Sequence, residues 1–158
     1  MKFFINTIVF ILVLSSICLS QKAAVKFDHI SIDQGLSEST VRTIWQDSKG
    51  FMWFGTGDGL NRYDGYKFTI FKRNPKEPNS ISHNMIWSIY EDSDSILWIG
   101  TDMGLNRFDY KIDQFTRYIN DPIDETSISH NSVRAILEDH LGNLWIGTNG
   151  GLNRFDRK

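Results

Sequence analysis

Residues 98–109 have the sequence WIGTDMGLNRFD, which recurs with few changes as WFGTGDGLNRYD at 53–64 and as WIGTNGGLNRFD at 145–156. The tryptophans that begin the three copies are 45 and 47 residues apart. Similar segments also flank the copies. An apolar run lies upstream of each, at 41–46, 86–91 and 133–138, and an aromatic run lies downstream of the first two, at 67–71 and 114–118. The chain is therefore a tandem repeat, and the repeat decides its fold.

Each full repeat consists of four short strand-like runs separated by turns rich in Asp and Gly. A period of about 45 residues built in this way is typical of a β-propeller blade. The first run carries a small residue in every copy, which suits an innermost strand where neighbouring blades crowd the axis. The sequence predicts an all-β fold of about three blades of four antiparallel strands, at about 40–72, 85–119 and 132–158, the last without its outer strand.

Residues 25–31 match the outer strand of a blade, and we expect them to form a lone outer strand that closes a ring by pairing into its last blade. Propellers typically hold four to eight blades, so three blades make an incomplete ring with apolar end faces. We therefore expect that residues 21–158 are a partial propeller, the first part of a longer protein or a truncated gene product. The alternative is that another copy of the chain completes the ring.

Residues 1–20 are typical of a signal peptide, with Lys2 followed by an apolar stretch and small residues up to Ser20. Cleavage would leave Gln21 as the new N-terminus. An uncleaved membrane anchor and a lipid on Cys18 remain alternatives. Because Cys18 is the only cysteine, cleavage leaves a mature chain with no disulfide and no thiol chemistry.

Composition excludes some partners. Lys and Arg number 17 and Asp and Glu 19, which gives a net charge of −2 and no basic excess that would indicate a nucleic-acid partner. No later segment is apolar enough to span a membrane. The mature chain is therefore expected to be exported, without nucleic acid and without a membrane span.

Residues that differ between copies are the candidates for a ligand site, because those that recur are expected to be architectural. In an antiparallel blade, the connection between successive blades and the turn between the second and third strands emerge at the same end. The variable residues of that end form our candidate ligand face, together with Trp87, which stands where the other copies have Arg. The face comprises Glu38, Asp58, His83, Met103, His130, Gly150 and Trp87. Solvated loop histidines and a packed tryptophan are the alternatives.

Other motifs favour structural roles. The glycines of 55–59 resemble a phosphate-binding loop, but no helix or Lys-Ser/Thr follows them, so a hairpin turn is favoured. The recurring Asn-Arg pairs favour bracing between strands or blades, and residues 92–95 lack the Gly and Glu of a calcium loop. No Ser-His-Asp set and no distinctive carboxylate pair occurs. We expect no catalytic residues, no cofactor and no metal.

The repeated pattern, Asp-x-x-Gly-x-x-Trp-Ile-Gly-Thr-x-x-Gly-Leu-Asn-Arg-Phe-Asp, resembles the two-component regulator propeller repeat. Blade two departs from it with Ser95 in place of Gly. The segment FDHISIDQGL at 27–36 is similar to the usual start of that family's sensor region. The resemblance covers residues 25–158 and implies a periplasmic sensor of a hybrid histidine kinase of the Bacteroides type.

Members of that family typically carry two propellers, a β-sandwich, one membrane span and a cytoplasmic kinase. The resemblance implies that the ligand is an oligosaccharide released from a glycan, bound through the full-length receptor, and that other blades are partners of these ones. The chain itself has no kinase motif, so it is not expected to be an enzyme. A fragment of an exported carbohydrate-active enzyme and a self-assembling propeller fragment remain the alternatives.

Overall fold

The structure is a computed structural model that describes residues 25–156. Within this range it has one short 3-10 helix and eleven β-strands. The helix η1 spans Ile32–Gln34, and the strands are β1 (Val41–Gln46), β2 (Met52–Thr56), β3 (Leu60–Tyr63), β4 (Phe68–Phe71), β5 (Ile86–Glu91), β6 (Leu97–Thr101), β7 (Gly104–Asp109), β8 (Gln114–Tyr118), β9 (Val133–Glu138), β10 (Leu144–Thr148) and β11 (Gly151–Phe155).

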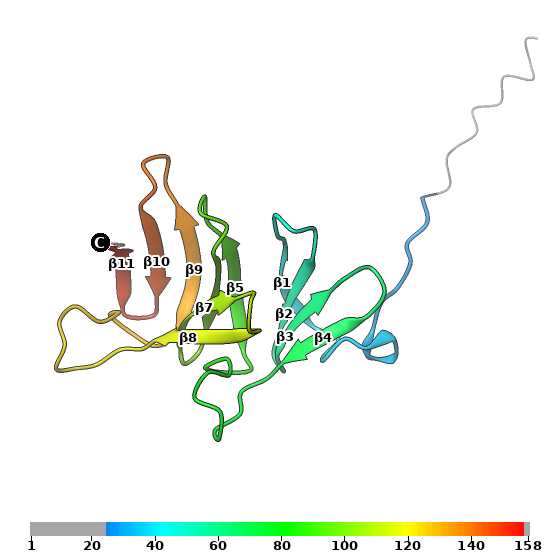
Figure 1. Cartoon of the computed structure of the whole chain (residues 1–158), viewed down its shortest axis with the longest axis horizontal. Coiled ribbons are helices and arrows are strands. Elements are labelled where there is room, and N and C mark those ends of the chain that lie inside the picture. The colour runs from blue at the N-terminus through cyan, green and yellow to red at the C-terminus, as the bar shows by residue number, and fades with distance from the viewer. Residues whose placement is uncertain (1–24, 157–158) are drawn as a thin grey trace, which may run out of the picture.

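The strands form three antiparallel sheets in which each strand pairs with its neighbours in the sequence. We call them blade 1 (β1–β4), blade 2 (β5–β8) and blade 3 (β9–β11). Figure 1 shows them side by side like a fan, and the first strands contact one another, β1 with β5 and β5 with β9. The prediction of four-stranded propeller blades in an incomplete ring is confirmed, and among the described residues blade 3 has no fourth strand.

A hydrogen bond between the turn aspartate and the repeated tryptophan fixes the first hairpin of each blade. Asp47 Oδ2 accepts the indole N–H of Trp53 at 2.7 Å, and its Oδ1 accepts the backbone N–H of Phe51 at 2.9 Å. The same indole bond joins Asp92 to Trp98 at 2.7 Å and Asp139 to Trp145 at 2.8 Å. The turn predicted over 92–95 is therefore part of the repeat.

A second repeated set joins the connection that precedes each blade to its later strands. In blade 1, the N–H of Ser37 donates to Asn61 Oδ1 at 2.9 Å, and the hydroxyls of Ser37 and Thr56 lie 2.9 Å apart. Blades 2 and 3 repeat the arrangement with Ser82, Thr101 and Asn106 and with Ser129, Thr148 and Asn153. The recurring asparagines are therefore braces, as the sequence favoured.

Carboxylates also join neighbouring blades. The N–H and hydroxyl of Ser48 in blade 1 both donate to the carboxylate of Glu91 in blade 2, at 2.7 and 2.8 Å. Ser93 of blade 2 binds Glu138 of blade 3 in the same way, at 2.6 and 2.8 Å. Each blade is thus attached to the next at equivalent places.

The hairpin between β7 and β8 is longer than its counterpart in blade 1, and this accounts for the longer second period. It reaches back to blade 1. There the Tyr110 hydroxyl donates to Asp47 Oδ2 at 2.8 Å, and Asp113 accepts two hydrogen bonds from the Arg62 guanidinium at 2.8 and 3.1 Å. The extra residues therefore make an interface between blades.

Residues 25–31 were expected to form a lone outer strand that closes the ring. They form no strand here; the chain instead enters η1, where Ser31 and Gln34 cap each other and Gly35 caps the C-terminal end. Their expected partner would be the third strand of a last blade, and β11 lies at the opposite end of the fan (Figure 1). Ring closure by this segment therefore stays a prediction, and the signal peptide of residues 1–20 lies outside the described residues.

Candidate functional site

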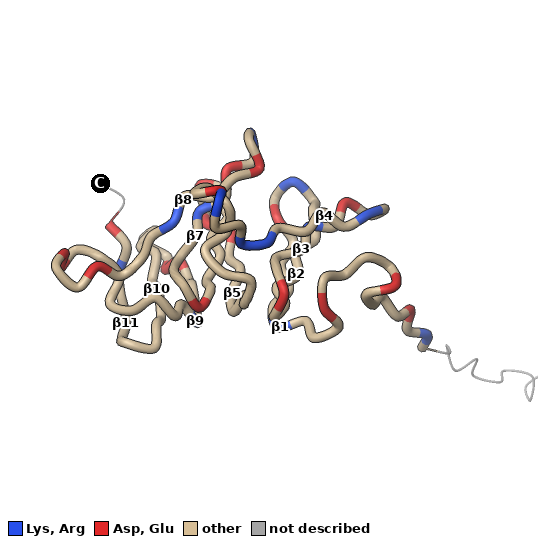
Figure 2. The backbone as a smooth tube through the Cα atoms, turned by 90° about the horizontal axis from the view of Figure 1, so that it is seen from below, with Lys and Arg blue, Asp and Glu red and all other residues tan. Residues whose placement is uncertain are grey.

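The connections between blades and the turns between second and third strands do share one end of the molecule. Backbone hydrogen bonds hold them together, from Gly59 N to Asn84 O at 2.9 Å and from Gly104 N to Asn131 O at 2.7 Å. This end lies along the lower edge of Figure 1, and Figure 2 views the molecule from that side. The geometric basis of the candidate ligand face is therefore present.

At the blade 1 end of this face, the two acidic residues already have partners. The Glu38 carboxylate accepts the backbone N–H of Gly57. Asp58 forms an ion pair with Lys72 at 2.6 Å and accepts a hydrogen bond from the Asn84 amide at 3.2 Å. Both carboxylates stabilise the loops that carry them.

The two histidines of the candidate face form hydrogen bonds within their own loops. Nδ1 of His83 accepts the N–H of Met85 at 3.0 Å, and Nδ1 of His130 accepts the N–H of Ser132 at 2.9 Å. Each ring is therefore bound through Nδ1 to the backbone of its own loop. No group of three or more His, Cys, Asp or Glu side chains suited to a metal occurs within 25–156.

Met103 and Gly150 occupy equivalent turns. Met103 is 44% exposed, and its N–H is bound by the Thr101 hydroxyl at 3.0 Å. A Cβ on Gly150 would lie 2.8 Å from Cβ of His130, so glycine permits the close approach of turn and connection. Of this pair, only Met103 offers a side chain to a ligand.

Trp87 is the centre of a cluster that joins all three blades. Its indole N–H donates to Asp102 Oδ1 at 2.8 Å, and the guanidinium carbons of Arg134 and Arg42 lie 3.9 and 4.9 Å from its ring centroid. Asp102 also accepts the Ser132 hydroxyl at 2.9 Å and lies 3.4 Å from Arg134. We call these five residues the axial cluster.

The electrostatics of the axial cluster favour an ionised Asp102. Burial alone would raise the pKa of this carboxyl. The hydrogen bonds from Trp87 and Ser132 and the positive charge of Arg134 outweigh burial and hold the pKa below its usual value. Asp102 is therefore an anion at neutral pH and partly neutralises Arg134.

Sequence reasoning placed Trp87 on the candidate face but missed the other four members of the axial cluster. Arg42 and Arg134 were visible only as the residues that align with Trp87. The alignment position at which blade 2 has Trp and the other blades have Arg was thus the one sequence signal for this cluster. Nothing in the sequence indicated that the three side chains converge.

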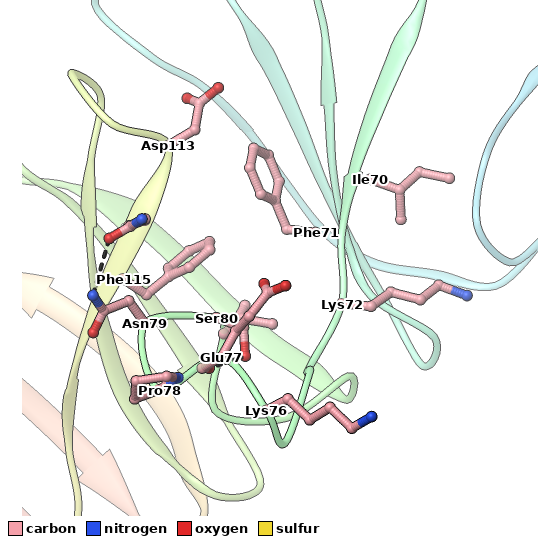
Figure 3. A pocket seen from close by; sticks show the side chains of 12 residues that line it. Ile70, Phe71, Lys72, Lys76, Glu77, Pro78, Asn79, Ser80, Asp113 and Phe115 are labelled. Carbon is pink, nitrogen blue, oxygen red and sulfur yellow. Dashed lines mark hydrogen bonds between the residues drawn. The ribbon is translucent and has the colours of Figure 1, made fainter.

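A groove at the outer side of blades 1 and 2 was not predicted at all. It has a volume of about 360 Å³ and lies between the end of β4 and the start of β8 (Figure 3). Phe71 and Phe115 form its apolar part, while Lys76, Glu77 and Asp113 lie at its rim. Because residues of two blades form it, comparing one position across the copies could not reveal it.

Charged residues of both signs are mixed over the three blades, as Figure 2 shows. In the described part of the chain, no helix has the length and apolarity needed to cross a bilayer.

Comparison with known proteins relates these blades to sensor proteins. A family model described as two component regulator propeller matches residues 80–103 and 127–150. A stretch of 48 residues is 52% identical to Histidine kinase P4 of Formosa agariphila, which corresponds to 30% of the chain and 4% of that protein.

Two solved structures from B. thetaiotaomicron are similar over most of the chain. The extracellular domain of a protein described as the hybrid two-component system BT3049 has a TM-score of 0.72 and 31% identity, over 82% of the chain and 20% of that domain. The extracellular domain of BT4673 has a TM-score of 0.68 and 35% identity, over 84% of the chain and 19% of that domain. The chain thus spans about a fifth of the solved domains it matches.

Proposed function

Because the chain contains two-component regulator propeller repeats, we propose that it is the N-terminal part of a periplasmic ligand-sensing propeller in a hybrid histidine kinase receptor. The observation that carries this proposal is its similarity to extracellular domains of two-component systems over more than four fifths of its length. The kinase itself would lie in other parts of the receptor, as the match to a histidine kinase over 4% of that protein suggests. The chain's role is then binding, without catalysis.

We further propose that the ligand is a glycan-derived oligosaccharide, bound on the candidate ligand face. Sugars are bound in proteins by polar side chains that surround an aromatic or apolar surface. The candidate face offers this combination around Met103, Trp87 and the axial cluster. The periplasm is the matching location, since that is where such a receptor meets oligosaccharides from outside the cell.

The direct test is a panel of oligosaccharides titrated into the purified full chain by calorimetry, with the sugar products examined by chromatography. We expect saturable binding of at least one oligosaccharide and unchanged sugars after incubation. Cleavage at enzymatic rates would instead support the carbohydrate-active enzyme. Absence of binding across the panel would contradict a glycan site on these three blades.

A further inference from the structure

The first strand of each blade carries a β-bulge at its second residue. In blade 1, Val41 pairs with Thr56 and Thr43 with Gly55, so Arg42 is the extra residue. The register of the other blades makes Trp87 and Arg134 the extra residues of β5 and β9. Bulges re-aim a side chain and often lie beside functional sites. The three residues that converge in the axial cluster are thus the bulged ones.

Stacking on Trp87 orders the arginines without using their hydrogen-bond donors. A guanidinium that lies over an aromatic ring uses its flat face, and its five N–H donors point outward in its own plane. Arg134 approaches from β9 and Arg42 from β1, on either side of β5. The cation–π contacts therefore hold both guanidinium groups beside Trp87.

The two arginines differ in what their donors bind. Arg134 Nε donates to Asn149 Oδ1 at 3.1 Å, and its NH2 group lies 3.4 Å from Asp102. Arg42 makes no ion pair and no side-chain hydrogen bond with any residue of 25–156, and the Glu38 carboxylate is held at Gly57. The donors of Arg42 are therefore open to an acceptor from outside the chain.

The repeat shows why Arg42 lacks a partner. In blades 2 and 3 the bulged side chain binds the residue after the repeated Thr of its own blade, as Trp87 binds Asp102 and Arg134 binds Asn149. In blade 1 that position is Gly57, which has no side chain to accept a hydrogen bond. The acceptor that completes the pattern is missing from blade 1 alone.

We propose that Arg42, held by Trp87 beside Arg134, binds an oxyanion of the ligand, so that the receptor recognises an acidic oligosaccharide bearing carboxylate or sulfate groups. Arg binds planar carboxylates and sulfate oxygens through two parallel N–H donors. This inference rests on the proposed function and specifies the ligand class for the same face.

The experiment titrates the full chain with hexagalacturonate, with its fully methyl-esterified form, and with a sulfated galactan hexasaccharide that lacks carboxylates. We expect Arg42→Gln to weaken binding of an acidic ligand about tenfold or more, as loss of a charge-assisted hydrogen-bonded pair does. Arg42→Lys keeps the charge but loses the fork, so its loss should be smaller. Preference for hexagalacturonate or for the sulfated sugar distinguishes the two oxyanions.

The matched control is Lys111→Gln, which removes one positive charge from the hairpin between β7 and β8 at the opposite end of the blade. We expect this variant to bind like the parent chain. Equal losses in Lys111→Gln and Arg42→Gln would mean that only net charge matters and would overturn the inference. Circular dichroism of each variant verifies that its fold is intact.

The outcomes separate this inference from the proposed function. Binding of the esterified sugar alone, or binding of acidic sugars that is insensitive to Arg42→Gln, would overturn the oxyanion subsite and leave a glycan sensor standing. Absence of binding to every oligosaccharide would contradict both.

Discussion

At the scale of single residues, the glycine after the Trp-Ile pair of blade 2 lies where its own first strand and the next blade both approach. A Cβ on Gly100 would clash with Ser88 Oγ of its own blade and would lie 2.9 Å from the Val133 carbonyl oxygen, on the first strand of blade 3. A Cβ on Gly147 would meet Ala135 of its own blade at an ordinary 3.5 Å. The glycine therefore lets the inner strand of the next blade pack against the second strand.

We predict that Gly100→Ala destabilises the chain by about 1–3 kcal/mol, as overpacking does, because the Val133 carbonyl oxygen belongs to the backbone and cannot turn away as the Ser88 hydroxyl can. Gly147→Ala is the matched control and should change the free energy of unfolding by less than about 0.5 kcal/mol. Urea unfolding of both variants measures the difference. Equal effects would show that the glycine serves its own strand and not the neighbouring blade.

Ser95 is a second residue at which one blade departs from the others. It adopts φ of +59°, while Gly50 and Gly142 at the equivalent turns have +88° and +81°. A left-handed conformation costs a residue with a Cβ about 1–2 kcal/mol. We predict that Ser95→Gly raises the free energy of unfolding by about 1 kcal/mol and raises Tm.

The reciprocal change, Gly50→Ser, should lower Tm, since a residue with a Cβ is strained at the φ of +88° that Gly50 adopts. Thermal unfolding followed by circular dichroism measures both variants. Opposite signs are expected, and a loss of stability in Ser95→Gly would show that the serine side chain has a compensating role.

At the scale of elements, the long hairpin of blade 2 makes the contact with blade 1 depend on pH. Burial, followed by the hydrogen bond to Asp47 and the charge of that carboxylate, raises the pKa of Tyr110 well above its usual value. The folded chain thus holds this proton more tightly than the unfolded chain, whose tyrosines titrate near pH ~10. The stability contributed by Tyr110 is present below about pH 10 and is lost as pH rises further.

We predict that the free energy of unfolding falls less steeply above about pH 10 in Tyr110→Phe than in the parent chain. Urea midpoints from pH 8 to 11 measure the two slopes, and subtraction removes the contribution of the other tyrosines. Parallel slopes would contradict a proton held between the blades by Tyr110 and Asp47.

Most elements were predictable because their causes are local. The strands β1, β2, β5 and β6 follow from short apolar runs that recur in each copy and are bounded by turns with Asp or Gly. The bulge at Trp87, the reach of Tyr110 and the free donors of Arg42 depend on neighbouring blades. The alignment of the copies identified the positions of these residues but could not give their contacts. Residues 25–31 form no strand because no partner strand lies beside them.

At the scale of the whole molecule, identical positions in the three blades differ sharply in exposure. Leu60 and Leu105 are fully buried by the blade that follows, whereas their equivalent in blade 3, Leu152, is 69% exposed. On the opposite side of the fan, Ile44 of blade 1 is 58% exposed, while its equivalent Ile89 is 5% exposed. Both end faces thus carry leucine or isoleucine at positions that bury against a neighbouring blade, and we infer that further blades cover them in the receptor.

We predict that the full chain by itself self-associates through these faces and that Leu152→Lys reduces the association, because apolar area stabilises contacts by about 25 cal/mol per Å² and a charge there must be desolvated. Leu141→Lys is the matched control, since Leu141 is 74% exposed but lies in the turn between β9 and β10, away from the blade face. Sedimentation velocity over a range of concentrations measures both variants. An effect of Leu141→Lys as large as that of Leu152→Lys would mean that charge alone governs association. A parent chain that stays monomeric would mean that these end faces do not drive self-association.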